Sequence, residues 1–293
     1  MKAAPFDLVP AGPAVGAFVR GIDLAQPLTP ETVEALEDAH ADYGVLFFRE
    51  QTLSPDQHIA LAEAFGDINV NRFFTPVAGH PQIAEVRKEP EQVTNIGGGW
   101  HTDHSYDQIP ALGSLLYARE VPATGGDTLF ASMYAAYDAL SEGMKDRLGT
   151  LRAVHSSRHV FGAGAARPAD LADRFGNAES ATQDAVHPVV LTHPRSGRRA
   201  LYVNPGFTVR FEGWTAEESR PLLEFLYRHA ARPEFSYRFS WAPGSLAFWD
   251  NRCTWHFAVN DYQGQRRLLH RITLEGEALE ECVTRTREGA RRG

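Results

Sequence analysis

The spacing of apolar positions predicts four helices in the chain. Thr29 and Ser54 are typical helix N-caps, and the apolar residues after them recur at helical spacing. Ser54 and Gln57 form a capping box, and Gly66 is expected to end the second helix. These signals predict helices from Pro30 to about Tyr43 and from Pro55 to Gly66. Residues 132–141 and 215–230 are the other two predicted helices.

Strand-like patterns occupy most of the remaining chain. The segment 235–241 alternates aromatic and polar residues, which is typical of a half-buried strand. Short apolar runs predict buried strands at 45–48, 112–117 and 245–249. The runs 189–191 and 200–203 flank a loop and predict a β-hairpin. Strands therefore dominate the second half, with helices inserted between them.

This order of elements predicts a mainly β fold with helical insertions. We expect a double-stranded β-helix core of the jelly-roll, cupin-like type, because no G-x-G-x-x-G fingerprint indicates a nucleotide-binding sheet. With 293 residues, 43% of them apolar, the chain can form one domain over residues 1–293. The segment from about 160 to 186 has weak periodicity and is expected to be a lid or an insertion.

Charge and composition exclude several classes of function. The net charge of −8 disfavours binding to nucleic acid. No apolar run approaches the length of a membrane span, and the first residues contain no signal-peptide core, so we expect a cytoplasmic protein. Twelve histidines against two cysteines indicate that any metal is held by nitrogen and oxygen.

The sharpest local motif is Trp100-His101-Thr102-Asp103-His104. On a strand, His101 and Asp103 would point to the same side. His256 is the best candidate for a third ligand, and two histidines with one carboxylate are the facial triad of non-haem Fe(II) oxygenases. A bare H-x-D is also compatible with a hydrogen-bonded pair beside an aromatic core. We interpret His40, His58, His80 and His229 as surface or helical residues.

Two arginines follow on a later predicted strand. Arg267 and Arg271 are four residues apart, so they lie on one face, about 13 Å apart along the strand. Buried arginines need anions, and two of them indicate two separate anionic ligands. The alternative is a solvent-facing cationic edge. Apolar residues alternate with them on the other face, which favours the buried arrangement.

Together these motifs resemble the taurine dioxygenase family of Fe(II)/2-oxoglutarate-dependent dioxygenases. The resemblance runs from the stretch Gly12 to Leu24 through to Arg271-Ile272-Thr273. It includes Trp100-His101-Thr102-Asp103, Thr124-Gly125-Gly126-Asp127-Thr128 and Trp249-Asp250-Asn251-Arg252. The middle of the chain looks closest to the aryloxyalkanoate dioxygenase branch.

The resemblance implies a role for each matching residue. It implies Fe(II), 2-oxoglutarate and O2 as cofactor and cosubstrates, with His101, Asp103 and His256 as iron ligands. Thr128 and Arg267 match the groups that bind the distal carboxylate of 2-oxoglutarate. Arg271 matches the arginine that holds the acidic group of the primary substrate. The implied substrate contacts also include aromatic residues, namely Phe161 and Phe207.

Three positions depart from the taurine-oxidising members. Those members carry a His and a Tyr after the second helix and an Asn before the W-H-T-D motif, where this chain has Asn71, Phe74 and Gly97. Taurine is therefore not the expected substrate. His104, directly after Asp103, is either a substrate contact or proton relay, or a satisfied histidine on the outer face of the strand.

We therefore expect hydroxylation of a C–H bond in a small anionic carboxylate or sulfonate, giving succinate and CO2, with fragmentation of the product where the carbon bears a heteroatom. A His/His/Asp zinc hydrolase is chemically possible but gives Thr128 and Arg267 no role. A non-catalytic barrel that binds a small acid is the third hypothesis. The family resemblance also implies a homo-oligomer, a dimer or a tetramer.

Overall fold

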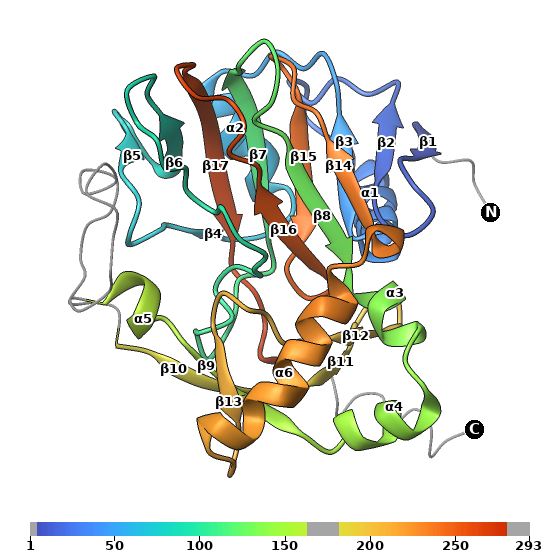
Figure 1. The fold of residues 1–293 in the computed structure, drawn as a ribbon. Coiled ribbons are helices and arrows are strands. Elements are labelled where there is room, and N and C mark those ends of the chain that lie inside the picture. Colours follow the sequence, from blue (N-terminus) through green and yellow to red (C-terminus); the bar gives the residue numbers. More distant parts are fainter. Residues whose placement is uncertain (1–4, 163–181, 280–293) are drawn as a thin grey trace.

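Two β-sheets face each other in the computed structural model, which describes residues 5–162 and 182–279 (Figure 1). Neighbouring strands in the main sheet are antiparallel except β2 and β3. The order is β1 (Asp7–Pro10), β2 (Ala17–Arg20), β3 (Val45–Phe48), β15 (Leu246–Asp250), β7 (Gly113–Glu120), β17 (Arg267–Leu274), β6 (His80–Lys88) and β5 (Pro76–Val77), with β4 (Ile68–Asn69) paired to β17.

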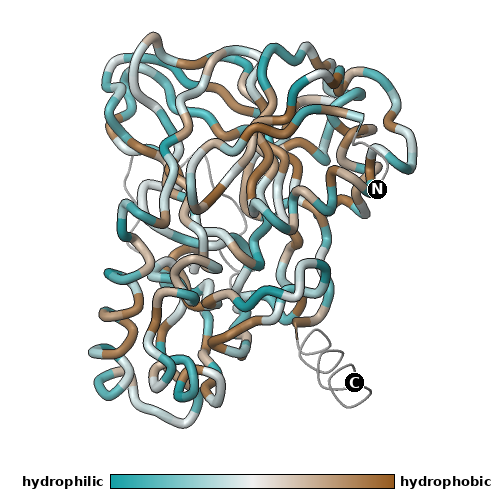
Figure 2. The backbone as a smooth tube through the Cα atoms, turned by 90° about the vertical axis from the view of Figure 1, so that its right-hand side faces the viewer, coloured by the Kyte–Doolittle hydropathy of each residue, from teal (hydrophilic) through white to brown (hydrophobic). Residues whose placement is uncertain are grey.

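The second sheet is small and antiparallel. It contains β14 (Ser236–Phe239), β8 (Thr128–Ser132) and β16 (Thr254–Ala258). Aromatic side chains fill the space between the sheets: Phe47 of β3 stacks on Phe239 of β14 at 4.3 Å and meets Phe130 of β8 edge-on. Figure 2 shows hydrophobic segments gathered where these strands pass one another. The predicted mainly β fold with a jelly-roll core is confirmed.

Two helices cover the outer face of the main sheet. Helix α1 (Pro30–Tyr43) and helix α2 (Pro55–Glu63) begin at the predicted caps, Thr29 and Ser54. Helix α2 ends at Glu63 and not at Gly66, because Phe65 N–H bonds back to the carbonyl of Ala62 and tightens the last turn. Their apolar faces pack on β15 and β17.

The helix expected over residues 132–141 is the shorter helix α3 (Met133–Asp138). It is followed by a helix that the sequence analysis did not predict, α4 (Glu142–Leu148), and Ser141 caps this helix by accepting a hydrogen bond from Met144 N–H. Serine is a common helix N-cap, and the predicted range ended at this residue. Helix α6 (Ala216–Ala230) forms within the predicted range 215–230 and begins with a capping box of Thr215 and Glu218.

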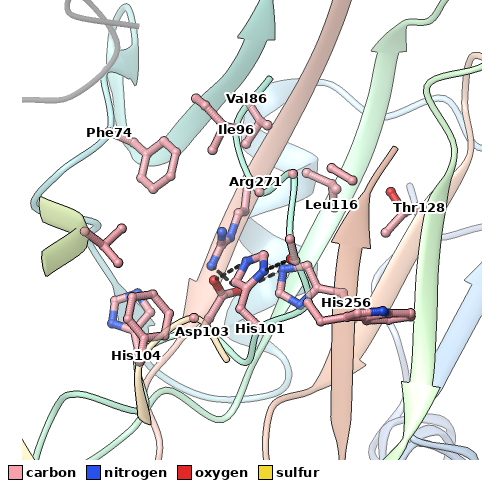
Figure 3. A pocket seen from close by; sticks show the side chains of 18 of the residues that line it. Phe74, Val86, Ile96, His101, Asp103, His104, Leu116, Thr128, His256 and Arg271 are labelled. Carbon is pink, nitrogen blue, oxygen red and sulfur yellow. Dashed lines mark hydrogen bonds and ion pairs between the residues drawn. The ribbon is translucent and has the colours of Figure 1, made fainter. Parts of the chain in front are cut away.

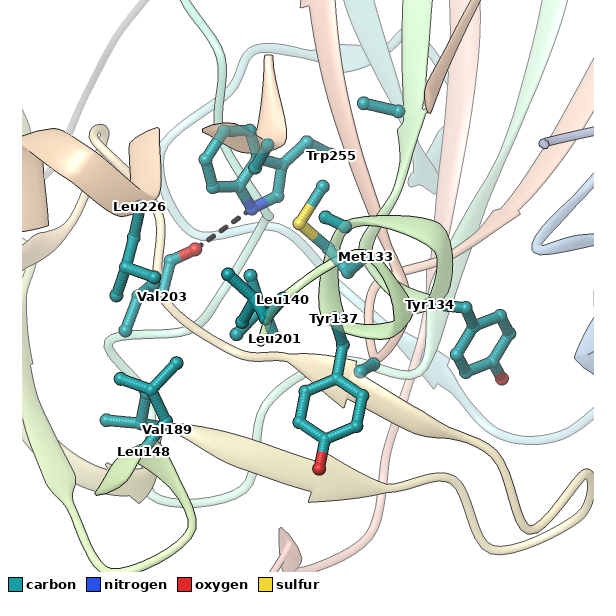
Figure 4. Packing of buried hydrophobic residues seen from close by; sticks show 14 of the residues in the cluster. Met133, Tyr134, Tyr137, Leu140, Leu148, Val189, Leu201, Val203, Leu226 and Trp255 are labelled. Carbon is teal, nitrogen blue, oxygen red and sulfur yellow. Dashed lines mark hydrogen bonds between the residues drawn. The ribbon is translucent and has the colours of Figure 1, made fainter. Parts of the chain in front are cut away.

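A further layer lies below the sheets (Figure 1). Its elements are β9 (Arg152–Ser156), α5 (Arg158–Phe161), β10 (Asp184–Pro188), β11 (Val190–Thr192), β12 (Arg199–Leu201), β13 (Thr208–Phe211) and the 3-10 helix η3 (Pro233–Phe235). Strands β11 and β12 pair as the predicted hairpin. Its core packs under α3 and α6, where Trp255 Nε1–H donates to the carbonyl of Val203 at 3.0 Å (Figure 4).

Most of the lid expected around 160–186 lies outside the described residues. Among the helices that the structure describes, none combines the length and the apolarity needed to cross a bilayer.

Candidate active site

His101, Asp103 and His256 meet beside β16, the edge strand of the small sheet (Figure 3). His101 pairs with His256 of β16 through an isolated antiparallel bridge with two backbone hydrogen bonds. Asp103 Oδ1 lies 3.6 Å from His101 Nε2, and Asp103 Oδ2 lies 3.5 Å from His256 Nε2. The strand expected at 101–103 is this single bridge followed by a turn, so convergence comes from the turn and not from strand alternation.

The donor set of these three residues fits a metal such as Fe(II). One potential ligand atom from each residue lies within 4.8 Å of the other two. His101 Nδ1–H donates to the carbonyl of Gly99 at 2.7 Å, which leaves a lone pair on Nε2. Burial and the neighbouring His101 hold the pKa of His256 well below its ordinary value, so its ring is neutral. A neutral imidazole is the form that binds a metal.

The carboxyl group of Asp103 is ionised in this setting. Burial alone would raise its pKa, but the positive charge of Arg271 outweighs burial and holds the pKa below its usual range. Together with His101 Nε2 and the neutral ring of His256, this carboxylate provides the nitrogen and oxygen donors that a facial triad requires. Arg271 Nη2–H donates to Asp103 Oδ2 at 2.7 Å, so the guanidinium lies directly beside the triad.

Arg267 is a buried cation that forms no ion pair with any described residue. Its Nε is buried without a hydrogen-bond partner among the described residues, and its Nη2 lies 3.5 Å from Thr128 Oγ1. The Trp241 indole N–H donates to Thr128 Oγ1 at 3.0 Å, which leaves the threonine hydroxyl hydrogen for another acceptor. An unmatched guanidinium beside a hydroxyl donor fits a carboxylate.

Arg271 follows Arg267 on the same face of β17, and both side chains line one cavity. The alternative of a solvent-facing cationic edge is therefore wrong. Arg271 Nε–H donates to Ser114 Oγ of β7 at 3.1 Å. The sequence analysis missed Ser114, although it is a polar residue inside an otherwise apolar strand.

The cavity has a volume of about 240 Å³ and one aromatic wall. Phe73 stacks on Phe161 at 4.5 Å, and Tyr106 meets Phe207 edge-on. The sequence candidates Asn71, Phe74, Phe161 and Phe207 all line this cavity, with Gly97 at its edge. Lining residues that sequence reasoning missed are Val86, Ile96, Tyr106, Leu116 and Val160. Their apolar side chains resemble ordinary core residues in the sequence.

His104 lies in the cavity wall and not on the outer face of a strand. It is buried, and its backbone has a φ of +56°, a left-handed conformation that costs a non-glycine residue about 1–2 kcal/mol. Its Nδ1 lies 2.9 Å from Asp107 Oδ2, and Arg72 donates to the other Asp107 oxygen at 2.6 Å. The hydrogen bonds from His104 and Arg72 outweigh burial and lower the pKa of Asp107.

A jelly-roll with a facial triad, an unmatched buried arginine and an apolar cavity defines the class of Fe(II)/2-oxoglutarate-dependent dioxygenases. Residues 7–273 match the model of the taurine catabolism dioxygenase TauD, TfdA family. A sulfate ester dioxygenase of Pseudomonas putida is 34% identical over 94% of this chain and 91% of its own length. A 2,4-dichlorophenoxyacetate dioxygenase of Cupriavidus pinatubonensis is 36% identical over 92% and 98%.

Solved structures agree with this assignment. The structure of AAD-2 with Mn(II) and N-oxalylglycine has a TM-score of 0.79 and 30% identity, covering 93% of this chain and all of that one (100%). A taurine dioxygenase from Burkholderia xenovorans has a TM-score of 0.78 and 35% identity, covering 93% and 91%. The chain belongs to the TauD, TfdA family. It is an oxidoreductase that depends on Fe(II), 2-oxoglutarate and O2, and the zinc hydrolase and non-catalytic alternatives are not supported.

Proposed function

We propose that the protein hydroxylates a small organic acid with an apolar body, and that His101, Asp103 and His256 are its iron ligands. The convergence of their ligand atoms supports this assignment. When bound, Fe(II) with 2-oxoglutarate and O2 supplies the oxidising chemistry that hydroxylates a C–H bond and yields succinate and CO2. The side chains of the protein would hold 2-oxoglutarate and the primary substrate in the correct position and orientation relative to the iron.

Thr128 and Arg267 are proposed to hold the distal carboxylate of 2-oxoglutarate. The main support is the buried guanidinium of Arg267, whose Nε has no hydrogen-bond partner among the described residues. The hydroxyl group of Thr128 beside it can still donate a hydrogen bond. Charge-assisted hydrogen bonds from both groups would fix the orientation of this cosubstrate. Figure 3 shows Thr128 on the opposite side of the triad from His104, so the two ends of the cavity differ in chemistry.

Arg271 is proposed to hold the acidic group of the primary substrate. Its guanidinium lies beside Asp103 and faces Phe74 at 5.9 Å, where an anion would lie close to the triad. Phe74, Phe161 and Phe207 would contact the apolar body. Asn71, Phe74 and Gly97 replace the residues that taurine-oxidising members carry, so taurine itself is not proposed. Relatives named for sulfate esters and for 2,4-dichlorophenoxyacetate support a larger anionic substrate.

The test is a screen of carboxylates, sulfonates, alkyl sulfates and aryloxyalkanoates for succinate formation with Fe(II) and 2-oxoglutarate. We expect at least one apolar acid to raise succinate formation well above taurine. Product analysis of that acid then decides between simple hydroxylation and fragmentation. A protein that consumes 2-oxoglutarate equally with every acid and with none would contradict a dedicated acid site.

The same screen with Arg271→Ala tests the assignment of the two arginines. This variant should weaken the primary substrate and retain decarboxylation of 2-oxoglutarate in the absence of that substrate. If it abolished 2-oxoglutarate binding instead, the roles of Arg267 and Arg271 would be exchanged.

We also propose a homo-oligomer, either a dimer or a tetramer, located in the cytoplasm. The family resemblance supports oligomerisation, and the sequence offers no apolar run for membrane insertion. Light scattering on the purified protein and fractionation of the source cells test these two points.

A further inference from the structure

His104 is held in a single orientation by a chain of polar contacts. Arg72 Nη2–H donates to Asp107 Oδ1 at 2.6 Å, and the other carboxylate oxygen of Asp107 lies 2.9 Å from His104 Nδ1. A carboxylate paired with an arginine only accepts hydrogen bonds, so His104 Nδ1 carries the hydrogen. Nε2 lies on the opposite side of the ring and is the acceptor in its contact with the Asn71 amide group.

Asn71 is equally fixed in its orientation. Its Oδ1 accepts from the backbone N–H groups of Phe73 and Phe74, at 2.9 and 3.1 Å. The amide nitrogen is therefore the atom that faces His104, and Asn71 Nδ2 lies 3.5 Å from His104 Nε2. That distance is at the limit of a hydrogen bond, so the donor and the acceptor are paired only weakly.

Both residues line the cavity of the candidate active site. The rest of this wall is aromatic, with Phe74, Phe161 and Phe207. His104 directly follows the candidate ligand Asp103, and it keeps its position in spite of a φ of +56°. A strained backbone maintained beside a reactive centre is a common mark of a functional residue.

A donor and an acceptor 3.5 Å apart match a group that itself both donates and accepts. A hydroxyl group can donate to His104 Nε2 while accepting from Asn71 Nδ2, and an amide can do the same with its N–H and C=O. An ether, a halogen or a methyl group offers no hydrogen for Nε2. The pair can therefore distinguish a substituent that both donates and accepts hydrogen bonds from one that does not, in a wall that is otherwise mostly apolar.

We propose that His104 and Asn71 form a specificity-determining pair that recognises a hydroxyl or amide group on the primary substrate, with Asp107 and Arg72 as positioning residues. The inference rests on the proposed function, in which Arg271 holds the acidic group. The substrate class becomes an organic acid with an aromatic or aliphatic body that carries one hydroxyl or amide group.

Matched acids provide the experiment. Phenoxyacetate, its 3- and 4-hydroxy derivatives and its 3- and 4-methoxy derivatives differ in the hydrogen that a substituent can donate. Their dissociation constants are measured by isothermal titration calorimetry on protein loaded with Mn(II) and 2-oxoglutarate under nitrogen. We expect at least one hydroxy acid to bind about five- to tenfold tighter than its methoxy partner, the range of one hydrogen bond.

Two variants test the residues themselves. His104→Gly removes the ring and suits the left-handed backbone, so it should fold, and the ratio of methoxy to hydroxy dissociation constants should fall to about one. Asp107→Asn keeps the size of the side chain but no longer fixes the hydrogen on Nδ1, and the ratio should fall part of the way. Because each readout is a ratio within one variant, a general loss of affinity does not change it.

Three outcomes would overturn the inference. Equal binding of hydroxy and methoxy acids by the unaltered protein would show that the pair does not select. A preference that survives in His104→Gly would place the selection elsewhere. Failure of every phenoxyacetate to bind would overturn the anionic site of Arg271 and this inference with it, whereas binding without preference overturns this inference alone.

Discussion

Arg267 is a fully buried guanidinium without an ion-pair partner among the described residues. Replacing it by Gln keeps most of the volume and removes the charge. We expect Arg267→Gln to weaken 2-oxoglutarate binding about 10- to 100-fold, because a charge-assisted contact in a buried site contributes roughly 1.5–3 kcal/mol. Calorimetric titration of 2-oxoglutarate into Mn(II)-loaded protein measures this directly.

Arg266 provides a matched control for that experiment. It lies directly before Arg267, the first residue of β17, and its guanidinium is paired with Glu89 and Glu120 at the surface. Arg266→Gln should leave the 2-oxoglutarate dissociation constant unchanged. An equal effect of both variants would mean that the net charge of the strand, and not the position of Arg267, attracts the cosubstrate.

His58 is a second buried residue with a measurable consequence. Both ring nitrogens are buried without a hydrogen-bond partner in the described chain, and burial lowers its pKa to about 3. The pKa of His40 and of His270 is lowered to about 4, also mainly by burial. The sequence analysis interpreted His40 and His58 as surface or helical residues. They lie on helices, but the surface interpretation is wrong.

These pKa values predict acid destabilisation. The unfolded chain takes up a proton near pH 6.5, while the folded protein keeps each of the three rings neutral until about pH 3–4. The free energy of unfolding should therefore be constant above pH 6.5 and fall as the pH decreases, by up to about 1.4 kcal/mol per pH unit for each histidine. Because burial also lowers the pKa of His155 and of His256, His58→Leu should remove about one fifth of that slope in urea denaturation curves recorded between pH 4 and 7.

His80 serves as the control for this pH dependence because it is partly exposed and paired with the exposed Asp56. The change in slope should be larger in His58→Leu than in His80→Gln, because the ring of His58 is buried and that of His80 is partly exposed. A slope that is the same in His58→Leu would mean that His58 is protonated equally in the folded and unfolded states.

At the scale of elements, the turn between β15 and β16 connects a buried ion cluster to the candidate site. Asp250 accepts from Arg252 Nη2 at 2.7 Å and from His193 Nε2 at 3.0 Å. His193 Nδ1 accepts from backbone N–H groups, so Nε2 carries the hydrogen. The same turn ends at Thr254, whose carbonyl accepts from the Thr102 hydroxyl between His101 and Asp103.

Asp250→Asn should destabilise the fold and loosen the site together. It removes the buried carboxylate that Arg252 and His193 contact and leaves Arg252, among the described residues, only the carboxylate of Glu277 at 3.5 Å, which costs up to about 3–5 kcal/mol. Urea denaturation measures the loss of stability, and Mn(II) titration should show weaker metal binding because the turn also positions His256. Glu142→Gln, which breaks an exposed pair with Lys145, should change stability by less than about 1 kcal/mol.

The elements with strong local signals could be predicted from the sequence. Helices α1 and α6 have side-chain caps that the sequence shows directly, and the alternation around Phe239 identified β14. Helix α4 after Ser141 was missed because local pattern alone does not tell a cap from a polar residue near a helix end. Arg267 could also be identified as a candidate site residue, because two arginines on one face of a predicted strand are a strong local signal.

Contacts between distant segments could not be predicted. Asp107 and Arg72 hold His104 across a separation of 35 residues, and Ser114 meets Arg271 across 157. Such pairs depend on strand register, which short motifs do not encode. His193 was overlooked for the same reason, because its partner Asp250 is 57 residues away.

At the scale of the whole molecule, the candidate site joins parts that are otherwise separate. Arg267 and Arg271 come from the main sheet, Thr128 and His256 from the small sheet, and His101 and Asp103 from the segment between β6 and β7. Ligands bound here would bridge the two sheets. The proposal that the chain is one domain over residues 1–293 then implies that site occupancy stabilises every element together.

Because bound ligands would bridge the two sheets, their binding should raise the thermal stability of the whole fold. A ligand present at about 100 times its dissociation constant stabilises the folded state by about 2.7 kcal/mol. For a chain of this length, dividing that free energy by the entropy of unfolding gives a rise in Tm of about 4 °C. We expect Mn(II) to raise Tm in calorimetry, with a further rise of this size on adding 2-oxoglutarate, in one cooperative transition. Arg267→Gln should retain the rise with Mn(II) and lose the second, because the cosubstrate would lack its anchor. Two separate transitions, only one of which responds to the ligands, would instead mean that the sheets and the lower layer unfold as independent domains.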